Sequence, residues 1–201
     1  MQAQEHARAI TRVMSSYIER GTNLSTAALA GCKKFIAWQH YPNNDAVDAE
    51  HGTEFYYHAH EKSERLANEH GHFHVFVRNQ GGRRFHHLIG ISMDPLGVPI
   101  RLFLTNQWVT GESWIDSNKI LPRLQRFECV IKGRLAPVAR WITGMVQLYG
   151  QDIAELHRAR DQWHTRYCRS VNRHGHLSDR NFHIVTQRKI DLFQRLSKVN
   201  V

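Results

Sequence analysis

The sequence lacks any long apolar run. A helix that crosses a bilayer needs roughly 20 consecutive apolar residues, and no segment approaches that length. The first ten residues, MQAQEHARAI, carry Glu5 and His6 where a secretory signal peptide would have its apolar core. We therefore expect a cytoplasmic protein with no membrane association.

Cysteine is scarce as well. The three cysteines, Cys32, Cys129 and Cys168, are widely separated, and none belongs to a C-x-x-C pair. An odd, scattered set argues against a disulfide framework and against a cysteine-based zinc module. We expect all three to be small buried residues.

Internal repeats, low-complexity tracts and clear linkers are also missing, so the 201 residues are expected to form one domain. Residues 1–37 should form a helical layer, residues 38–118 a histidine-rich β module, and residues 119–201 a mainly helical, basic part. The expected fold class is α+β, with an antiparallel β-meander of about four or more strands, N-terminal helices and a mostly helical C-terminal part.

Local patterns support this division. Strand-like composition occurs in TEFYYHAH, HFHVFVRN, FHHLIGISM and VPIRLFLTNQW, and FHIVTQ is a further candidate near the C-terminus. Helical spacing of apolar residues predicts helices over residues 3–20 and 137–168. The stretch HYPNND is expected to be a loop, and Pro122 is expected to interrupt a helix.

Histidine is the residue that is abundant. Of 15 histidines, nine fall within residues 40–87, and they include two H-x-H pairs, His58/His60 and His72/His74. Side chains alternate along a strand, so each pair should lie on one face, and pairing of the two strands would gather four imidazoles. Imidazole suits zinc, iron, copper and nickel. The alternative is a sheet surface that merely carries histidines.

Other residues could complete such a site. Glu69 and Asp48 are candidates for a general base, a ligand or a partner that orients an imidazole. Tyr56 or Tyr57 is a candidate proton donor, and we favour Tyr57. His40 is a further candidate ligand, and a role in stabilising its turn is equally compatible with its position.

Two family patterns bear on this region. The spacing of glycine, histidine and glutamate over residues 52–71 fits the first motif of the cupin family. The second cupin motif asks for a histidine after a P-x-G turn, where this sequence has Ile100, so a cupin barrel is not favoured.

The motifs HYPNND, YYHAH, GHFH and TNQWVTGE, taken in order, resemble those of an uncharacterised bacterial family, a domain of unknown function. The resemblance covers residues 33–118. It implies that these motifs belong together in one module, and it brings no known activity. Within TNQWVTGESW, Asn106 and Trp108 are candidates for holding a substrate near the metal, and a capped strand end is the alternative.

The net charge of +9 is concentrated in the C-terminal third, where residues 155–201 hold ten Lys or Arg against four acidic residues. We interpret the chain as a metal-dependent enzyme, an oxidoreductase or hydrolase, with a divalent transition metal (Fe, Zn or Cu) and a small-molecule or peptide substrate. The alternatives are a non-catalytic metal- or haem-binding protein, and a basic module that binds an acidic protein or nucleic acid.

Overall fold

The computed structural model describes residues 2–79, 81, 84–170 and 175–199, and within these ranges the fold is α+β. One sheet runs through it as a meander, in which each strand pairs antiparallel with the next in the order β1-β2-β3-β4-β5-β6. The strands are β1 (Tyr41–Asp48), β2 (Thr53–His58), β3 (Gly71–Arg78), β4 (Phe85–Met93), β5 (Pro99–Thr105) and β6 (Ile184–Lys189). The expected α+β meander is confirmed.

Helices precede and follow the first five strands. The described helices are α1 (Gln2–Glu19), α2 (Leu24–Ala28), α3 (Gln107–Thr110), α4 (Ser117–Gln125), α5 (Ala136–Leu148), α6 (Gly150–Ser170) and α7 (Leu192–Lys198), with 3-10 turns η1 (Lys62–Glu64), η2 (Gly133–Leu135) and η3 (Gly175–Ser178). Across the described residues, no helix has both the length and the apolar character needed to span a membrane.

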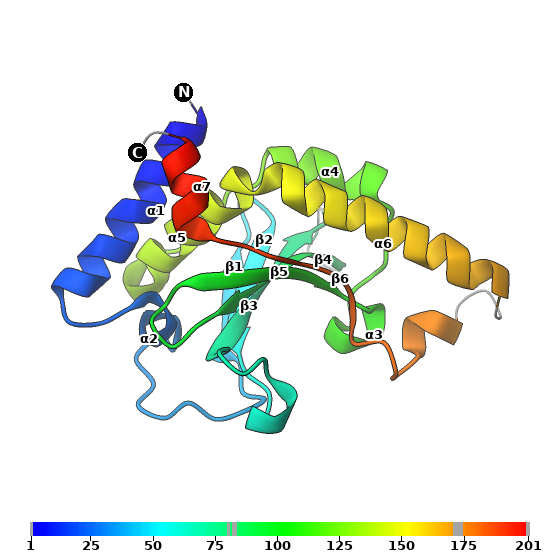
Figure 1. Ribbon diagram of the computed structural model, residues 1–201, viewed down its shortest axis with the longest axis horizontal. Helices are drawn as coiled ribbons and strands as arrows, with labels where there is room; N and C mark the ends of the chain where they lie inside the picture. Colours follow the sequence, from blue (N-terminus) through cyan, green and yellow to red (C-terminus); the bar gives the residue numbers. More distant parts are fainter. Residues whose placement is uncertain (1, 80, 82–83, 171–174, 200–201) are drawn as a thin grey trace.

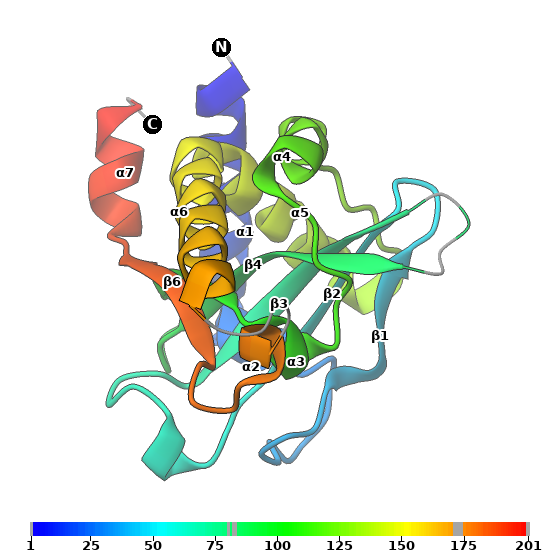
Figure 2. The same cartoon turned by 90° about the vertical axis from the view of Figure 1, so that its right-hand side faces the viewer.

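Helices cover one face of the sheet. Figure 1 shows α1, α4, α5 and α6 on the same side of the strands, and the turned view in Figure 2 agrees. Alternate strand residues such as Phe55, Tyr57, Phe73 and Val75 belong to the core formed on this side. The Phe73 ring lies 5.7 Å from Trp141 of α5. The hydrophobic core therefore occupies the space between the sheet and these helices.

The opposite face of the central strands is also buried. Every residue of β2 and residues 71–77 of β3 are buried, so neither face of this strand pair is open to solvent. Strand alternation places His58, His72 and His74 on the face away from the helices. The segment that contains η1 lies on that side of the sheet (Figure 1). The fold thus buries a second, polar layer.

Two expectations about local structure were wrong. Residues 41–45 of the stretch HYPNND are not a loop but the first part of β1. Pro42 is accommodated because β1 is an edge strand and its register with β2 shifts between Tyr41 and Ala46. Pro122 does not interrupt a helix but lies inside α4. Its ring removes one hydrogen bond, and the buried side chains of Ile120 and Leu124 offset that loss.

Other expectations are closer to the structure. FHIVTQ does contain a strand, β6, which pairs with β5. The long C-terminal helix is divided at Tyr149 into α5 and α6. Burial is confirmed for Cys129, whereas Cys32 is exposed and Cys168 is half-buried.

A buried ion pair joins α6 to the sheet. Arg160 of α6 donates from Nη1 to Glu112 Oε1 at 2.9 Å, and both side chains are 0% exposed. The other carboxylate oxygen accepts the backbone N–H of His87 in β4 at 2.6 Å. The guanidinium also lies over the Trp114 ring, 4.2 Å from its centroid. One carboxylate therefore connects a helix, a strand and the segment after α3.

We expect Glu112→Ala to lower the free energy of unfolding by about 3–5 kcal/mol, because it leaves a buried guanidinium without its counter-charge. Urea unfolding followed by circular dichroism measures the change. The control is Glu155→Gln, which removes the exposed partner of Arg188 and should leave stability unchanged. A Glu112→Ala protein as stable as the control would contradict the proposed importance of the pair.

Candidate metal centre

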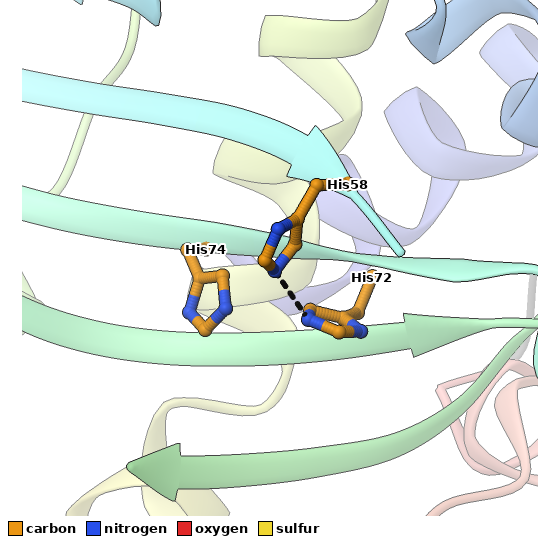
Figure 3. Close-up of side chains that lie close together, drawn as sticks. All are labelled: His58, His72 and His74. Carbon is orange, nitrogen blue, oxygen red and sulfur yellow. Dashed lines mark hydrogen bonds between the residues drawn. The ribbon is translucent and has the colours of Figure 1, made fainter. Parts of the chain in front are cut away.

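Three histidines converge on the polar face of the sheet. The β2–β3 register pairs His58 with His72 and Tyr56 with His74, so the three imidazoles lie next to one another. They are 7%, 4% and 2% exposed for His58, His72 and His74. One ligand atom from each lies within 4.8 Å of the others, and Figure 3 shows the three rings together. The geometry is that of a group that could hold a metal ion.

The rings of His58 and His72 approach each other through their Nε2 atoms. Nε2 of His58 and Nε2 of His72 are 2.7 Å apart, the contact marked in Figure 3. Two imidazole nitrogens on one tetrahedral zinc would be roughly 3.3 Å apart, because each Zn–N bond is about 2.0–2.1 Å. An ion would therefore enter after the rings open by about half an ångström, a small side-chain adjustment.

Glu69 holds His72 in the tautomer that a metal requires. His72 donates from Nδ1 to Glu69 Oε1 at 2.6 Å, which leaves Nε2 without a proton and directed at His58. Arg101 donates from Nη2 to the other Glu69 oxygen at 2.9 Å. Burial by itself would raise the Glu69 pKa, but the hydrogen bond with His72 and the charge of Arg101 outweigh it and lower that pKa. Glu69 is thus an ionised partner of a candidate ligand.

A second buried contact orients His74. Its Nδ1 lies 2.9 Å from Nε2 of His87, and Nδ1 of His87 lies 3.3 Å from the Thr105 hydroxyl. This arrangement leaves Nε2 of His74 for a ligand. His87 reaches the polar face because the β3–β4 register shifts between Val75 and Phe76, so that Phe76 pairs with His87.

A cavity adjoins the cluster. It has a volume of about 380 Å³, and His72 and His74 form part of its wall. Phe103, also in the wall, packs edge-on to both rings, with centroids 5.3 and 5.7 Å away. Phe103 occupies the space above Gly90, where a Cβ atom would collide with its ring. The cluster therefore borders a space that a small molecule could enter.

His58, His60 and His74 are neutral near pH 7. Burial is the largest cause that lowers the pKa of His58 and His74, and neighbouring histidines lower both further. Burial likewise lowers the pKa of His60 to about 4. Metal ligands must be unprotonated, so the environment already supplies the required state.

A family model described as a domain of unknown function, DUF6969, matches residues 4–190. The chain belongs to this family. The expectation of an uncharacterised domain family is thereby confirmed. No curated protein and no solved structure matches the chain.

In this DUF6969 chain, the other predicted ligands lie beside the cluster. His60 follows β2 in the chain, stacks on Trp38 at 4.3 Å between centroids, and has its ring 5.2 Å from those of His58 and His72. The ring of His40 stacks on Tyr56 at 3.6 Å, and its Nδ1 lies 2.9 Å from the Asp45 carboxylate. His40 and His60 therefore both lie beside the three clustered rings.

The structure does not bring Tyr57 and Asp48 to the cluster. Strand alternation turns Tyr57 toward the helices, where its hydroxyl lies 2.8 Å from His70 Nδ1, and Tyr56 takes the place on the histidine face. Asp48 pairs with Thr53 at the opposite end of β2 from His58. Its carboxylate accepts the backbone N–H of Val130 at 2.7 Å, which ties β1 to the segment before α5.

Asn106 and Trp108 form hydrogen bonds within the chain and do not line the cavity wall. Asn106 donates from Nδ2 to the His176 carbonyl at 2.8 Å, and its Oδ1 accepts the N–H of Gln107 as the cap of α3. Trp108 donates from Nε1 to the Phe182 carbonyl at 3.0 Å. These two side chains fix the segment that precedes β6.

We expect metal-free DUF6969 protein to lose stability as pH falls below about 6.5, the ordinary histidine pKa. His157 illustrates the sign: burial lowers its folded-state pKa to about 3, so between these values the unfolded chain binds the extra proton. The free energy of unfolding therefore decreases on acidification. At about pH 5 this one group accounts for a loss of about 2 kcal/mol.

Urea unfolding at about pH 7.5 and about pH 5 with a chelator present measures the loss. His157→Gln is the comparison, because its amide can still donate to the Leu88 carbonyl, the bond His157 makes at 2.8 Å, but does not titrate. The pH-dependent loss should be smaller in the variant. Equal stability of the unmodified protein at both pH values would contradict the argument.

Proposed function

We propose that this protein is a metal-dependent enzyme whose ion is held by Nε2 atoms of His58, His72 and His74 and whose small-molecule substrate occupies the adjoining cavity. The observation that carries the proposal is the convergence of three buried imidazoles beside that cavity. A bound divalent ion supplies a Lewis acid, or a redox centre if it is iron or copper.

Three protein ligands favour catalysis over storage. Structural zinc sites have four protein ligands, whereas catalytic sites keep a position open for water or substrate. A volume of about 380 Å³ lies within the usual size range of small-ligand pockets. Its wall combines apolar groups, such as Phe103 and Val109, with Arg65 and His183. The site therefore offers both an open coordination position and room for a substrate.

Roles for the neighbouring residues follow from their contacts. Glu69 acts as a positioning residue, because its two oxygens are engaged by His72 and Arg101. His60 is the better candidate for accepting a proton, since it lines the cavity and is neutral near pH 7.

A non-catalytic metal-binding protein is the second candidate. It is favoured by the ring of His60, which lies close enough to those of His58 and His72 to supply a fourth ligand after a side-chain rotation. His60→Ala separates the two functions. Unchanged metal affinity supports an open catalytic position, and a loss like that of a ligand variant supports a closed shell.

The metal prediction concerns protein purified without an affinity tag. We expect about one equivalent of zinc, iron or copper at the triad, lost from His72→Ala and kept in His6→Ala, whose imidazole is on α1. Elemental analysis with isothermal titration measures content and affinity. Identical metal retention in His72→Ala and His6→Ala would sink the proposed ligand set, and the metal found would decide between hydrolytic and oxidative chemistry.

A separate prediction concerns Glu69→Gln. This change keeps the size of the side chain but removes the charge that pairs with His72 and Arg101, so metal affinity should fall by about 10–100-fold. Glu64→Gln is the matched control, since Glu64 also lines the cavity but is exposed. Competition with a chromophoric chelator measures both affinities. Equal affinities in the two variants would show that Glu69 does not support the metal site.

A further inference from the structure

A second group of ligand-type side chains lies at the C-terminal end of α6. His164 and Cys168 are four residues apart and so share a face of the helix, and His176 comes from η3. One ligand atom from each lies within 4.8 Å of the others. This set shares no residue with the histidine triad of the sheet.

The distances suit a tetrahedral ion with one sulfur and two nitrogens. Nδ1 of His164 is 2.6 Å from Nε2 of His176, and the Cys168 sulfur is 3.9 Å from the same Nδ1. In a tetrahedral zinc site these separations would be roughly 3.3 and 3.6 Å, from Zn–N of about 2.0–2.1 Å and Zn–S of about 2.3 Å. The two nitrogens would have to move apart by about 0.7 Å and the sulfur would have to move closer by about 0.3 Å to satisfy both.

The surrounding structure fixes these ligands from several sides. The backbone of His176 is held by the hydrogen bond that its carbonyl accepts from Asn106. Trp114 lies against His164, with ring centroids 4.8 Å apart, and is itself held under the Arg160 guanidinium. Trp163 packs edge-on to His176 at 5.3 Å. The sequence motif around Asn106 thus supports this cluster rather than a substrate.

We propose that His164, Cys168 and His176 form a second metal site, specific for a thiolate-binding ion of the zinc type. Thiolate sulfur and imidazole nitrogen are both zinc ligands, and binding releases the thiol proton to solvent. The ion connects α6 to η3 and so steadies the chain that leads to His183 and Ile184 in the wall of the cavity. The triad of the sheet contains no sulfur, which makes the two sites distinguishable.

Cobalt substitution tests the proposal on the full chain. Co²⁺ bound to a thiolate gives a charge-transfer absorption in the near ultraviolet, which a site with only histidines does not give. We expect this band in unmodified protein and in His72→Ala, and its loss in Cys168→Ser and His164→Ala. The control is Cys32→Ser, which changes an exposed cysteine and should keep the band. Absence of the band from unmodified protein, or its persistence in Cys168→Ser, overturns the proposal.

Alkylation provides a measurement that needs no variant, should Cys168→Ser not fold. Zinc should slow iodoacetamide modification of Cys168 by about tenfold or more, because the reactive thiolate is bound, and should leave Cys32 unaffected. Peptide mapping by mass spectrometry compares the two cysteines in one sample. Equal rates at Cys168 with and without zinc refute the second site and leave the proposal for the triad untouched.

Discussion

The buried pair between Arg160 and Glu112 is the constraint on which both candidate sites depend. Two full charges without exposure are tolerated in a protein interior only when they are paired and hydrogen-bonded. Glu112 meets this requirement by also accepting the N–H of His87, which fixes the backbone of β4 where that strand approaches His74. Arg160 extends the same constraint along α6, through the ring of Trp114, to His164. A single ion pair therefore sets the position of the strand behind one cluster and of the helix that carries the other.

The sheet separates two kinds of burial. Toward the helices, alternate residues of β2 and β3 are aromatic or aliphatic, and their burial supplies the hydrophobic stabilisation of the fold. On the opposite face, the alternate positions hold imidazoles that are equally buried but require hydrogen-bonding partners. Those partners are Glu69, His87 and, beyond them, Arg101 and Thr105. The polar layer is thus a hydrogen-bonded network. The apolar layer on the other face packs against the helices and so keeps the strands in register.

Strand alternation was enough to predict from sequence that His58, His72 and His74 lie together. Sequence spacing was not enough to predict which residues surround them. His58, His72 and His74 converge because period-two geometry and hairpin order follow directly from the sequence pattern. The contribution of His87 depends on a register shift in β4 that no local signal specified. Alternation also explains why Tyr57, a candidate proton donor, faces the helices and not the histidine cluster. The cluster on α6 was missed because His176 is brought to His164 by tertiary packing.

The contact between His58 and His72 limits how many protons the polar layer can hold. Glu69 holds the proton of His72 on Nδ1, so Nε2 of His72 has a lone pair directed at Nε2 of His58. One proton, on His58, can bridge the two nitrogens, and a further proton on either ring would place a positive charge in a desolvated site. Burial and the neighbouring histidines both oppose that charge, as the lowered pKa of His58 indicates. At the proposed metal site, an ion would replace the bridging proton, accept both lone pairs and also engage His74, which a proton cannot do. The orientation of the rings therefore supports the proposal of a shared ion.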